Sequence, residues 1–463
     1  MTFQTNFPLY PTKLPYITVS AKGMSNGLSD IPNDGADFGP DTLLGTSSKG
    51  QYGPPYTQTV GIQEAMNYAS SVAVYSPAEA NYIFPKINLL DGIFEFSTPV
   101  ICNNPYSNFA YVAVEGSNQW TTDIVYTGTG NAITFADNFS LVDIRNLSMD
   151  NPNQTADSMI YWDYSSSGSG SSVVIENINT GQGTSGYFFY LNNILVAVIK
   201  NINLPSYHAF YINGLHGYSS YLYLLGQGVW SGTSSTIGNF AIAEISGVNQ
   251  QIIVNNPIFT LKISSCLATG VEANAQIGSL LIDNSVIGTN GGNGPSLIVN
   301  ANINYIKLLS NLISGSFISS TNTSTQYTIG YLNIDGLYNN YIVGYFNNTS
   351  NVKINALELK NISPGTFSSL PTQSSTNGTT AGTVSMDAVE YRIEYKKYVV
   401  TFSGYENDTT TNQTINFPLP FSSYAVITAN NTGLTISTTT SGITITSPNS
   451  TTTYSGIVIV EGY

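Results

Sequence analysis

The chain has 463 residues, of which 9% are charged, 41% hydrophobic and 12% aromatic, and its formal net charge is −14. So few bases, with no basic patch among them, exclude a typical nucleic-acid-binding protein. No apolar run approaches the about 20 residues of a membrane-spanning helix, so we expect no membrane insertion. The apolar and aromatic content predicts an ordered core. Because few ionised groups can change their pKa on folding, we expect the fold to tolerate acid.

The N-terminal region combines an arm with a helix. Residues 1–30 are rich in Pro and Thr without a periodic pattern, which predicts an attachment or interface arm. They lack the basic and apolar regions of a signal peptide. A helix is expected over residues 60–71, with Thr59 as its N-cap, and we expect it to cover the end of the structure that follows. Its apolar stripe, at helical spacing, consists of Ile62, Ala65, Met66 and Ala69.

Four motifs then follow one another between residues 33 and 135. They are Asp34-Gly-Ala-Asp37, the helix just described, the strand sequence LLDGIFEF and the sequence VAVEGSNQWTTDIVYTG. Their order and spacing resemble the N-terminal half of the pectate-lyase-like superfamily of right-handed β-helices. The third motif departs from the family pattern, because its Pro and Tyr are replaced by Leu90 or Asp91 and by Phe94. The resemblance implies a fold and no particular chemistry, since the superfamily includes lyases, hydrolases, isomerases and phage tailspikes.

From residue 142 to residue 361 one short phrase recurs: apolar, any residue, Ile or Leu, any residue, then Asn, Gly or Ser. Most of its closing residues follow one another at intervals of 18 to 31 residues, which is typical of a solenoid. Alternation predicts a strand in each phrase, and Asn or Gly suits a sharp corner in left-handed backbone conformation. We expect one short strand per turn, stacked in parallel as a β-helix. The phrases occupy residues 142–146, 173–177, 197–201, 222–226, 243–247, 261–265, 280–284, 333–336 (shortened) and 357–361.

The predicted fold class is therefore all-β, with four segments. An N-terminal arm occupies residues 1–30, the parallel β-helix residues 31–367, a low-complexity linker residues 368–383 and a β-sandwich residues 384–463. The short alternating strands of the last segment are similar to the small C-terminal β domains of viral tail fibres. That resemblance implies trimerisation and receptor binding.

Candidate catalytic residues are few. Asp150, Asp157 and Asp163 lie on the long excursion between two phrases, where loops often carry function. Asp143 and Glu176, close in register to Arg145 and Lys200, are either an acid pair or a row of alternating charges, and we favour the row.

Metal, cofactor and disulfide sites are not predicted. His208 and His216 have no Cys, Asp or Glu between residues 201 and 243 to complete a metal site. We expect no metal and no cofactor. Cys102 and Cys266 are predicted to be buried and unpaired, because they lie several turns apart.

Aromatic residues offer a binding surface instead. Stacked rings beside amide groups suit sugars or a sister subunit, although such rings can also fill the core. The candidates for binding are Tyr207, Tyr211, Tyr218, Tyr221 and Trp230. Glycosylation sequons are dense, either by chance in an Asn- and Thr-rich chain or because the protein is extracellular. The candidate acceptors are Asn138, Asn153, Asn322, Asn348, Asn377, Asn407, Asn412, Asn430 and Asn449.

Together these features favour a virion surface protein of the tailspike or fibre type, used for attachment to host cells. We expect a homotrimer that contacts other virion proteins and binds a glycan of the host surface. The low charge suits a virus of a thermoacidophilic archaeon. One alternative is a tailspike-type polysaccharide depolymerase, a glycoside hydrolase or lyase, on the same scaffold. Another is a cellular surface-layer protein or adhesin.

Overall fold

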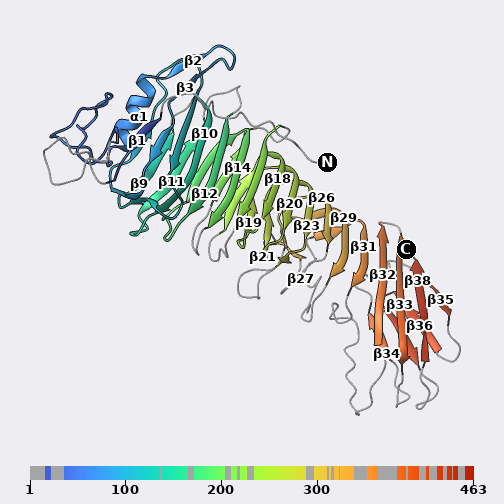
Figure 1. Cartoon of the computed structure of the whole chain (residues 1–463). Coiled ribbons are helices and arrows are strands. Elements are labelled where there is room, and N and C mark those ends of the chain that lie inside the picture. The colour runs from blue at the N-terminus through green and yellow to red at the C-terminus, as the bar shows by residue number, and fades with distance from the viewer. Residues whose placement is uncertain are drawn as a thin grey trace. The chain divides into compact units, whose positions relative to one another are not determined.

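The chain forms two compact units, residues 1–248 and residues 249–463, both built mainly from β-strands (Figure 1). Among the residues that the computed structural model describes, α1 (Ile62–Ser71) is the one α-helix. The described residues are 16–21, 36–135, 138–164, 171–203, 210–215, 219–226, 234–287, 297–309, 312–313, 318–322, 324–337, 352–362, 383–392, 395–405, 413–416, 425–430, 435–440, 442–446 and 454–462.

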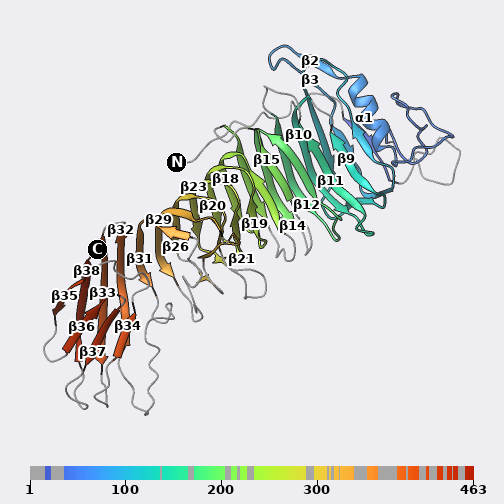
Figure 2. The same cartoon turned by 180° about the vertical axis from the view of Figure 1, so that it is seen from behind.

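The first unit contains two parallel sheets in which strands from consecutive turns pair with one another, as expected of a β-solenoid (Figures 1 and 2). The first sheet includes β7 (Ala110–Gly116), β10 (Phe139–Asp150), β12 (Ser172–Asn179), β14 (Val196–Asn203), β16 (Tyr221–Gly226) and β18 (Phe240–Ser246). The second sheet consists of β6 (Val100–Cys102), β9 (Gly130–Phe135), β11 (Ala156–Asp163), β13 (Phe189–Ile194), β15 (Phe210–Gly214) and β17 (Ser235–Gly238). Each turn thus adds a strand to both sheets, and the prediction of one strand per turn is wrong.

The repeated phrase forms the first sheet in register. Ile144 pairs with Ile175, which pairs with Ile199, and the series continues to Leu224 and Ile245. All five side chains are buried. Because successive turns place the same apolar position one above another, each turn extends a continuous core. The pairing confirms the solenoid predicted from the repeat.

The closing Asn of the phrase forms a corner, as predicted, but the strand does not end there. Asn146, Asn177 and Asn201 have φ angles of 57°, 58° and 52°, in the left-handed region. Strands β10, β12 and β14 continue beyond these residues. The residue that directly follows the Asn, such as Leu147 or Ile178, is again buried. The corner therefore bends one strand onto a second face and does not terminate it.

In the N-terminal part of this unit α1 packs against strands β1 (Ile17–Val19), β4 (Ile87–Leu89) and β6. Its predicted apolar stripe is buried. The predicted N-cap is wrong, because the helix starts after Gly61, whose φ of 83° suits glycine. The Thr59 hydroxyl still accepts a hydrogen bond from the backbone N–H of Gln63, at 3.1 Å. The neighbouring strands are β2 (Val74–Ser76), β3 (Asn81–Ile83), β5 (Gly92–Phe96) and β8 (Thr122–Tyr126).

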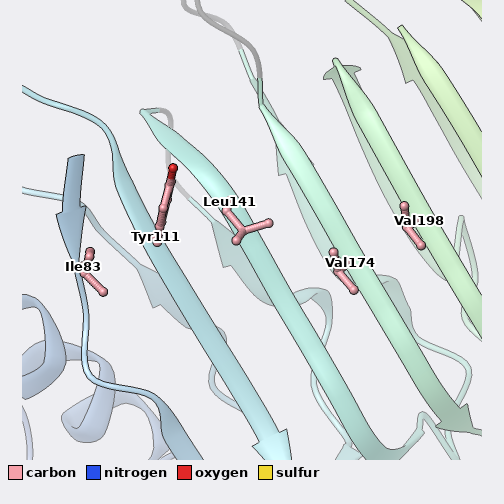
Figure 3. Close-up of a cluster of buried hydrophobic side chains, with 5 residues drawn as sticks. All are labelled: Ile83, Tyr111, Leu141, Val174 and Val198. Carbon is pink, nitrogen blue, oxygen red and sulfur yellow. The ribbon is translucent and has the colours of Figure 1, made fainter. Parts of the chain in front are cut away.

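A second apolar cluster lies on the first sheet, on the face opposite the solenoid core (Figure 3). Strand alternation places Leu141 and Val174 on the other side from the core residues Val142 and Ile175. The members are nevertheless buried, so this part of the sheet is covered on both faces, as is usual for parallel sheets. The cluster consists of Ile83, Tyr111, Leu141, Val174 and Val198.

The second unit repeats the parallel arrangement. In its longest parallel series Leu261, Leu280, Ile306, Leu332 and Leu357 share one register position. The turn at Ile306 also carries the phrase, although it was not among the turns predicted from the sequence. The strands of this series are β20 (Ile258–Ser264), β23 (Ile277–Asp283), β26 (Ile303–Leu309), β29 (Tyr327–Leu337) and β31 (Leu357–Ile362), with β30 (Val352–Ile354) beside β29. Shorter parallel series are β19 (Ile252–Val254), β22 (Val271–Ala273), β25 (Leu297–Val299) and β28 (Ile318–Ser319), and β21 (Leu267–Thr269), β24 (Val286–Ile287) and β27 (Leu312–Ile313).

Antiparallel pairing begins at the end of this series. Strand β32 (Thr383–Arg392) pairs antiparallel with β31, so the last edge of the parallel series is hydrogen-bonded. The antiparallel strands that follow are β33 (Tyr395–Tyr405), β38 (Tyr454–Gly462) and β35 (Ala425–Asn430), and, in a separate sheet, β34 (Gln413–Asn416), β37 (Gly442–Thr446) and β36 (Thr435–Thr439). Apart from Thr383, the predicted linker lies outside the described residues, as does most of the predicted arm, and the predicted segment boundaries stay predictions.

Candidate ligand-binding face

Three strands of the second sheet carry one pattern: apolar, Tyr, apolar, Asp or Asn. In β11, β13 and β15 the residues Tyr161, Tyr190 and Tyr211 share one register position. The apolar residues on either side of each tyrosine are buried in the core. Because side chains alternate across a strand, the tyrosines and the Asp or Asn residues lie on the face away from the core. Asn213 is buried there, at 8% exposure, and the other members are half-buried. Two polar rows therefore run from turn to turn on this face.

The first row is a stack of phenol rings, which we call the tyrosine row: Tyr161, Tyr190 and Tyr211. The ring centroids of Tyr161 and Tyr190 are 4.8 Å apart with 11° between the planes, and those of Tyr190 and Tyr211 are 4.6 Å apart with 7°. These distances match the spacing of paired strands. Tyr187 packs obliquely against both Tyr190 and Tyr211, with centroids 6.1 and 5.5 Å away.

The second row, the amide row, consists of Asp163, Asn192 and Asn213. The Nδ2 group of Asn192 donates a hydrogen bond to Oδ1 of Asp163, and Nδ2 of Asn213 donates to Oδ1 of Asn192, both at 2.9 Å. The Tyr161 hydroxyl, at 3.4 Å, donates to the other carboxylate oxygen of Asp163. The two rows are thus joined at Asp163.

Burial, together with neighbouring groups, keeps the phenols of Tyr190 and Tyr211 protonated. Burial, then the neighbouring Tyr211 and Asp163, raises the pKa of Tyr190 to about 12. Burial, Tyr187 and Asp163 also raise the pKa of Tyr211. The hydroxyl groups therefore remain neutral donors and acceptors at any physiological pH.

The predicted binding residues are only partly brought together. Tyr211 belongs to the tyrosine row, but Tyr221 lies on β16 in the first sheet, and Tyr207, Tyr218 and Trp230 lie outside the described residues. Tyr161 and Tyr190 were missed. The pattern Tyr-apolar-Asp/Asn, repeated at intervals of 29 and 21 residues, is the sequence signal that finds them.

Two of the three predicted catalytic aspartates, Asp157 and Asp163, lie far apart on one strand. Asp157 and Asp163 lie at opposite ends of β11, about 20 Å apart at the usual rise of a strand. Oδ1 of Asp150 accepts hydrogen bonds from the backbone N–H groups of Gly181 and Gln182, the latter at 3.0 Å. Asp163 belongs to the amide row.

Asp150 instead lies near a fourth carboxyl group, that of Asp123. Asp150 pairs with Val125, two residues along β8 from Asp123 and on the same face. Burial and the negative charge of Asp150 raise the pKa of Asp123. Its Oδ1 atom is buried and has no hydrogen-bond partner. No sequence pattern indicates this pair, because 27 residues separate its members and no motif links them.

The acidic residues of the repeated phrase form a row of alternating charges. This charged row comprises Lys86, Glu115, Arg145 and Glu176, with Lys200 next in register. Arg145 contacts Asp143 at 2.6 Å and Glu176 at 3.0 Å, and Lys86 pairs with Glu115. Asp143 is only 7% exposed, and its pKa is raised by burial although Arg145 acts to lower it. The interpretation as a charge row is confirmed.

Three predicted glycosylation acceptors lie among the described residues outside strands. Nδ2 of Asn138 donates to the carbonyl oxygens of Tyr106, at 2.9 Å, and Asn104, at 3.3 Å. Nδ2 of Asn322 donates to the Tyr327 hydroxyl, whereas the exposed Asn153 makes one long contact, 3.4 Å from the Thr127 carbonyl oxygen. Asn430 ends β35. The remaining predicted acceptors, Asn348, Asn377, Asn407, Asn412 and Asn449, lie outside the described residues.

Other features of the described residues concern metals, cysteines and membranes. No group of three or more His, Cys, Asp or Glu side chains in the described part of the chain is arranged to hold a metal ion. His208 and His216 lie outside that part. Cys102 and Cys266 are buried and form no disulfide, as predicted. Among the described residues, no helix combines the length and apolarity needed to cross a membrane.

Comparison with protein-family models and with curated proteins finds no match for this chain.

Proposed function

We propose that this protein is a glycan-binding attachment protein and that the tyrosine row and the amide row form its binding face. The observation that carries the proposal is the outward pairing of three phenols with three Asp or Asn side chains on consecutive turns. Carbohydrates are recognised by aromatic groups together with a few well-placed polar groups. A stacked parallel scaffold holds such groups at fixed spacing, which lowers the entropic cost of binding.

The location that we propose for this function is the surface of a virion. The low charge, the dense sequons and the sequence resemblance to tailspike-type β-helices support it. In this proposal the solenoid is a right-handed β-helix capped by α1, and the antiparallel strands after residue 383 form a β-sandwich. Three copies would assemble with other virion proteins and present the binding face to the host glycan.

The direct test combines a glycan array, a hydrolysis assay and light scattering on the same purified protein. The double variant Tyr190→Ala, Tyr211→Ala should lose glycan binding, because it removes the centre and one end of the tyrosine row. The matched control is Tyr305→Ala, which disrupts the stacked pair Tyr305–Tyr331 of the second unit, where the centroids are 5.6 Å apart. The control should bind as the wild type does. A monomer that binds no glycan would contradict the proposal.

A second candidate function, polysaccharide hydrolysis, is favoured by the pair Asp123 and Asp150. A carboxyl group with a raised pKa beside an ionised one is the arrangement that glycosidases use as acid and base. Hydrolysis of a bound glycan that disappears in both Asp123→Asn and Asp150→Asn would support it. If no bound glycan releases reducing ends, hydrolysis is excluded and attachment remains as the proposed function.

A further inference from the structure

The ring faces of the tyrosine row are largely used within the row itself. Tyr190 stacks on Tyr161 on one side and on Tyr211 on the other, at 4.8 and 4.6 Å with nearly parallel planes. Tyr187 packs against the same two rings, Tyr190 and Tyr211. A sugar that stacks on an aromatic ring needs an open ring face, which Tyr190 does not offer. What the central tyrosine presents outward is its edge and its hydroxyl group.

The polar groups of this face repeat with the spacing of the strands. Hydroxyl groups follow one another along the tyrosine row, and amide or carboxylate groups follow one another along the amide row, at intervals of about 4.8 Å. Both rows cross the strands, so they run in the direction in which the turns are stacked. An extended polyhydroxylated chain lying in this direction meets donors and acceptors at regular steps.

The charge of the face is of one sign. The strands β11, β13 and β15 contain no Lys, Arg or His, and Asp163 carries the negative charge within the amide row. Asp163 is close enough to Tyr190 and Tyr211 to raise the pKa of both phenols. A carboxylate or sulfate group of a ligand would be repelled in the same place.

We infer that the face selects an uncharged polysaccharide, bound along the direction of turn stacking and recognised by hydroxyl and amide groups in place of ring stacking. This inference rests on the proposed function, since it names the ligand class of the same face. Tyr190 supplies a hydroxyl at the centre of the site, and Asp163 excludes acidic glycans while it accepts hydrogen bonds from sugar hydroxyls.

The test compares immobilised neutral polysaccharides (dextran, mannan and a β-glucan) with anionic ones (alginate, polygalacturonate and hyaluronan). Wild-type protein should bind at least one neutral polymer and bind the anionic polymers more weakly. Tyr190→Phe keeps the ring and removes only the hydroxyl, so it should weaken neutral binding about three- to ten-fold, as expected for one lost hydrogen bond. Tyr331→Phe is the matched control in the second unit, and its binding should equal that of the wild type.

Asp163→Asn tests the charge separately. The substituted amide can still accept the hydrogen bond from Asn192, so the amide row is preserved, as a thermal melt would verify. Binding of anionic polymers should rise about two- to five-fold, the scale of an exposed charge interaction, whereas binding of neutral polymers should fall, because the amide has one acceptor oxygen where the carboxylate has two.

Two results would overturn the inference while leaving the glycan-binding function intact. One is wild-type affinity in Tyr190→Phe together with lost binding in Tyr190→Ala, which would indicate recognition by the ring. The other is equal binding of neutral and anionic polymers that Asp163→Asn does not change. Failure of the wild type to bind any of these polymers would overturn both this inference and the proposed function.

Discussion

The charged row on the first sheet and the tyrosine row on the second share the same geometry but differ in how their side chains interact. Both place equivalent side chains on consecutive turns of the first unit. In the charged row Arg145 is held by Asp143 and Glu176, so its charge is neutralised within the fold. In the tyrosine row the rings stack on one another, and the Tyr161 hydroxyl donates a hydrogen bond to Asp163.

The difference indicates how to separate support from function in a solenoid. Regular spacing alone does not mark a binding site, because both rows have it. A row whose polar groups neutralise one another stabilises the stack, whereas a row that keeps neutral polar groups at its outer edge can also bind a ligand. The variants below test this distinction, from the largest expected effect to the smallest.

The largest effect is expected for Arg145→Met. The substitution leaves Asp143 buried without its cation and should lower the free energy of unfolding by about 2–4 kcal/mol. Chemical denaturation measures this loss, and glycan binding by the folded variant should be unchanged. Glu176→Gln keeps the Asp143–Arg145 contact and should cost less than about 1 kcal/mol. Equal stability of Arg145→Met and wild type would show that the charged row does not stabilise the fold.

The corner residue Asn177 comes next. Its Nδ2 donates to Oδ1 of Asn146 at 2.7 Å, its Oδ1 accepts from Asn201 at 2.9 Å, and its φ is 58°. Asn177→Ala loses both hydrogen bonds and puts Ala in the left-handed region, which should cost about 2–3 kcal/mol. Asn177→Gly loses the same bonds without backbone strain, so it should be about 1 kcal/mol more stable than Asn177→Ala. Equal denaturation midpoints for the two variants would exclude a contribution from the backbone.

Acid should not weaken the first sheet. The pKa values of Asp123 and Asp143 are raised above those of an unfolded chain, mainly by burial. The native state therefore binds these protons more tightly than the unfolded chain does. The free energy of unfolding is greatest below about pH 3.8, the ordinary pKa of Asp, and it falls as the pH rises through the raised pKa values. The Tm should hold or rise between pH 7 and pH 4, and Asp123→Asn should reduce the rise. A wild-type Tm that falls steeply over this range would contradict the prediction.

The smallest effect on stability is expected for Tyr190→Phe. The ring stack remains, so the free energy of unfolding at pH 7 should change by less than about 1 kcal/mol. Because folding raises the pKa of Tyr190 from 10.0 to about 12, its contribution is present below pH 10 and is lost as the pH approaches 12. Phenolate absorbance should show one fewer late-ionising tyrosine in the variant. If Tyr190→Phe lost as much stability as Arg145→Met, the distinction between the charged row and the tyrosine row would be wrong.

The repeated phrase predicted the first sheet well because it combines two structural requirements, buried apolar positions and a corner. Buried Ile or Leu positions recur from turn to turn, and several turns share a left-handed corner, as Ile144, Ile175 and Asn177 illustrate. The second sheet was not predicted. Its pattern around Tyr161, Tyr190 and Tyr211 extends over three turns only, whereas the phrase recurs from residue 142 to residue 361.

Of the binding face that we propose, the sequence pattern singled out one residue, Tyr211. The sequence pattern grouped aromatic residues that are close along the chain, such as Tyr211 and Tyr221. In a solenoid, spatial neighbours are one turn apart in sequence, and residues ten apart lie on different sheets. The carboxyl pair Asp123 and Asp150 escaped prediction in the same way, because only register places Asp150 opposite Val125.

The hydrogen bonds between stacked amides all have one direction. Asn201 donates to Asn177, Asn177 to Asn146 and Asn146 to the Glu115 carboxylate, while Asn213 and Asn192 lead in the same sense to Asp163. A carboxylate only accepts, so it is a natural terminus for such a chain of donors, and each bond polarises the next. Within these two series each turn therefore offers a side-chain oxygen that accepts from the Nδ2 group of the turn that follows. A duplicated turn could be inserted into this series without breaking its polarity, which gives the solenoid a simple route to change length during evolution.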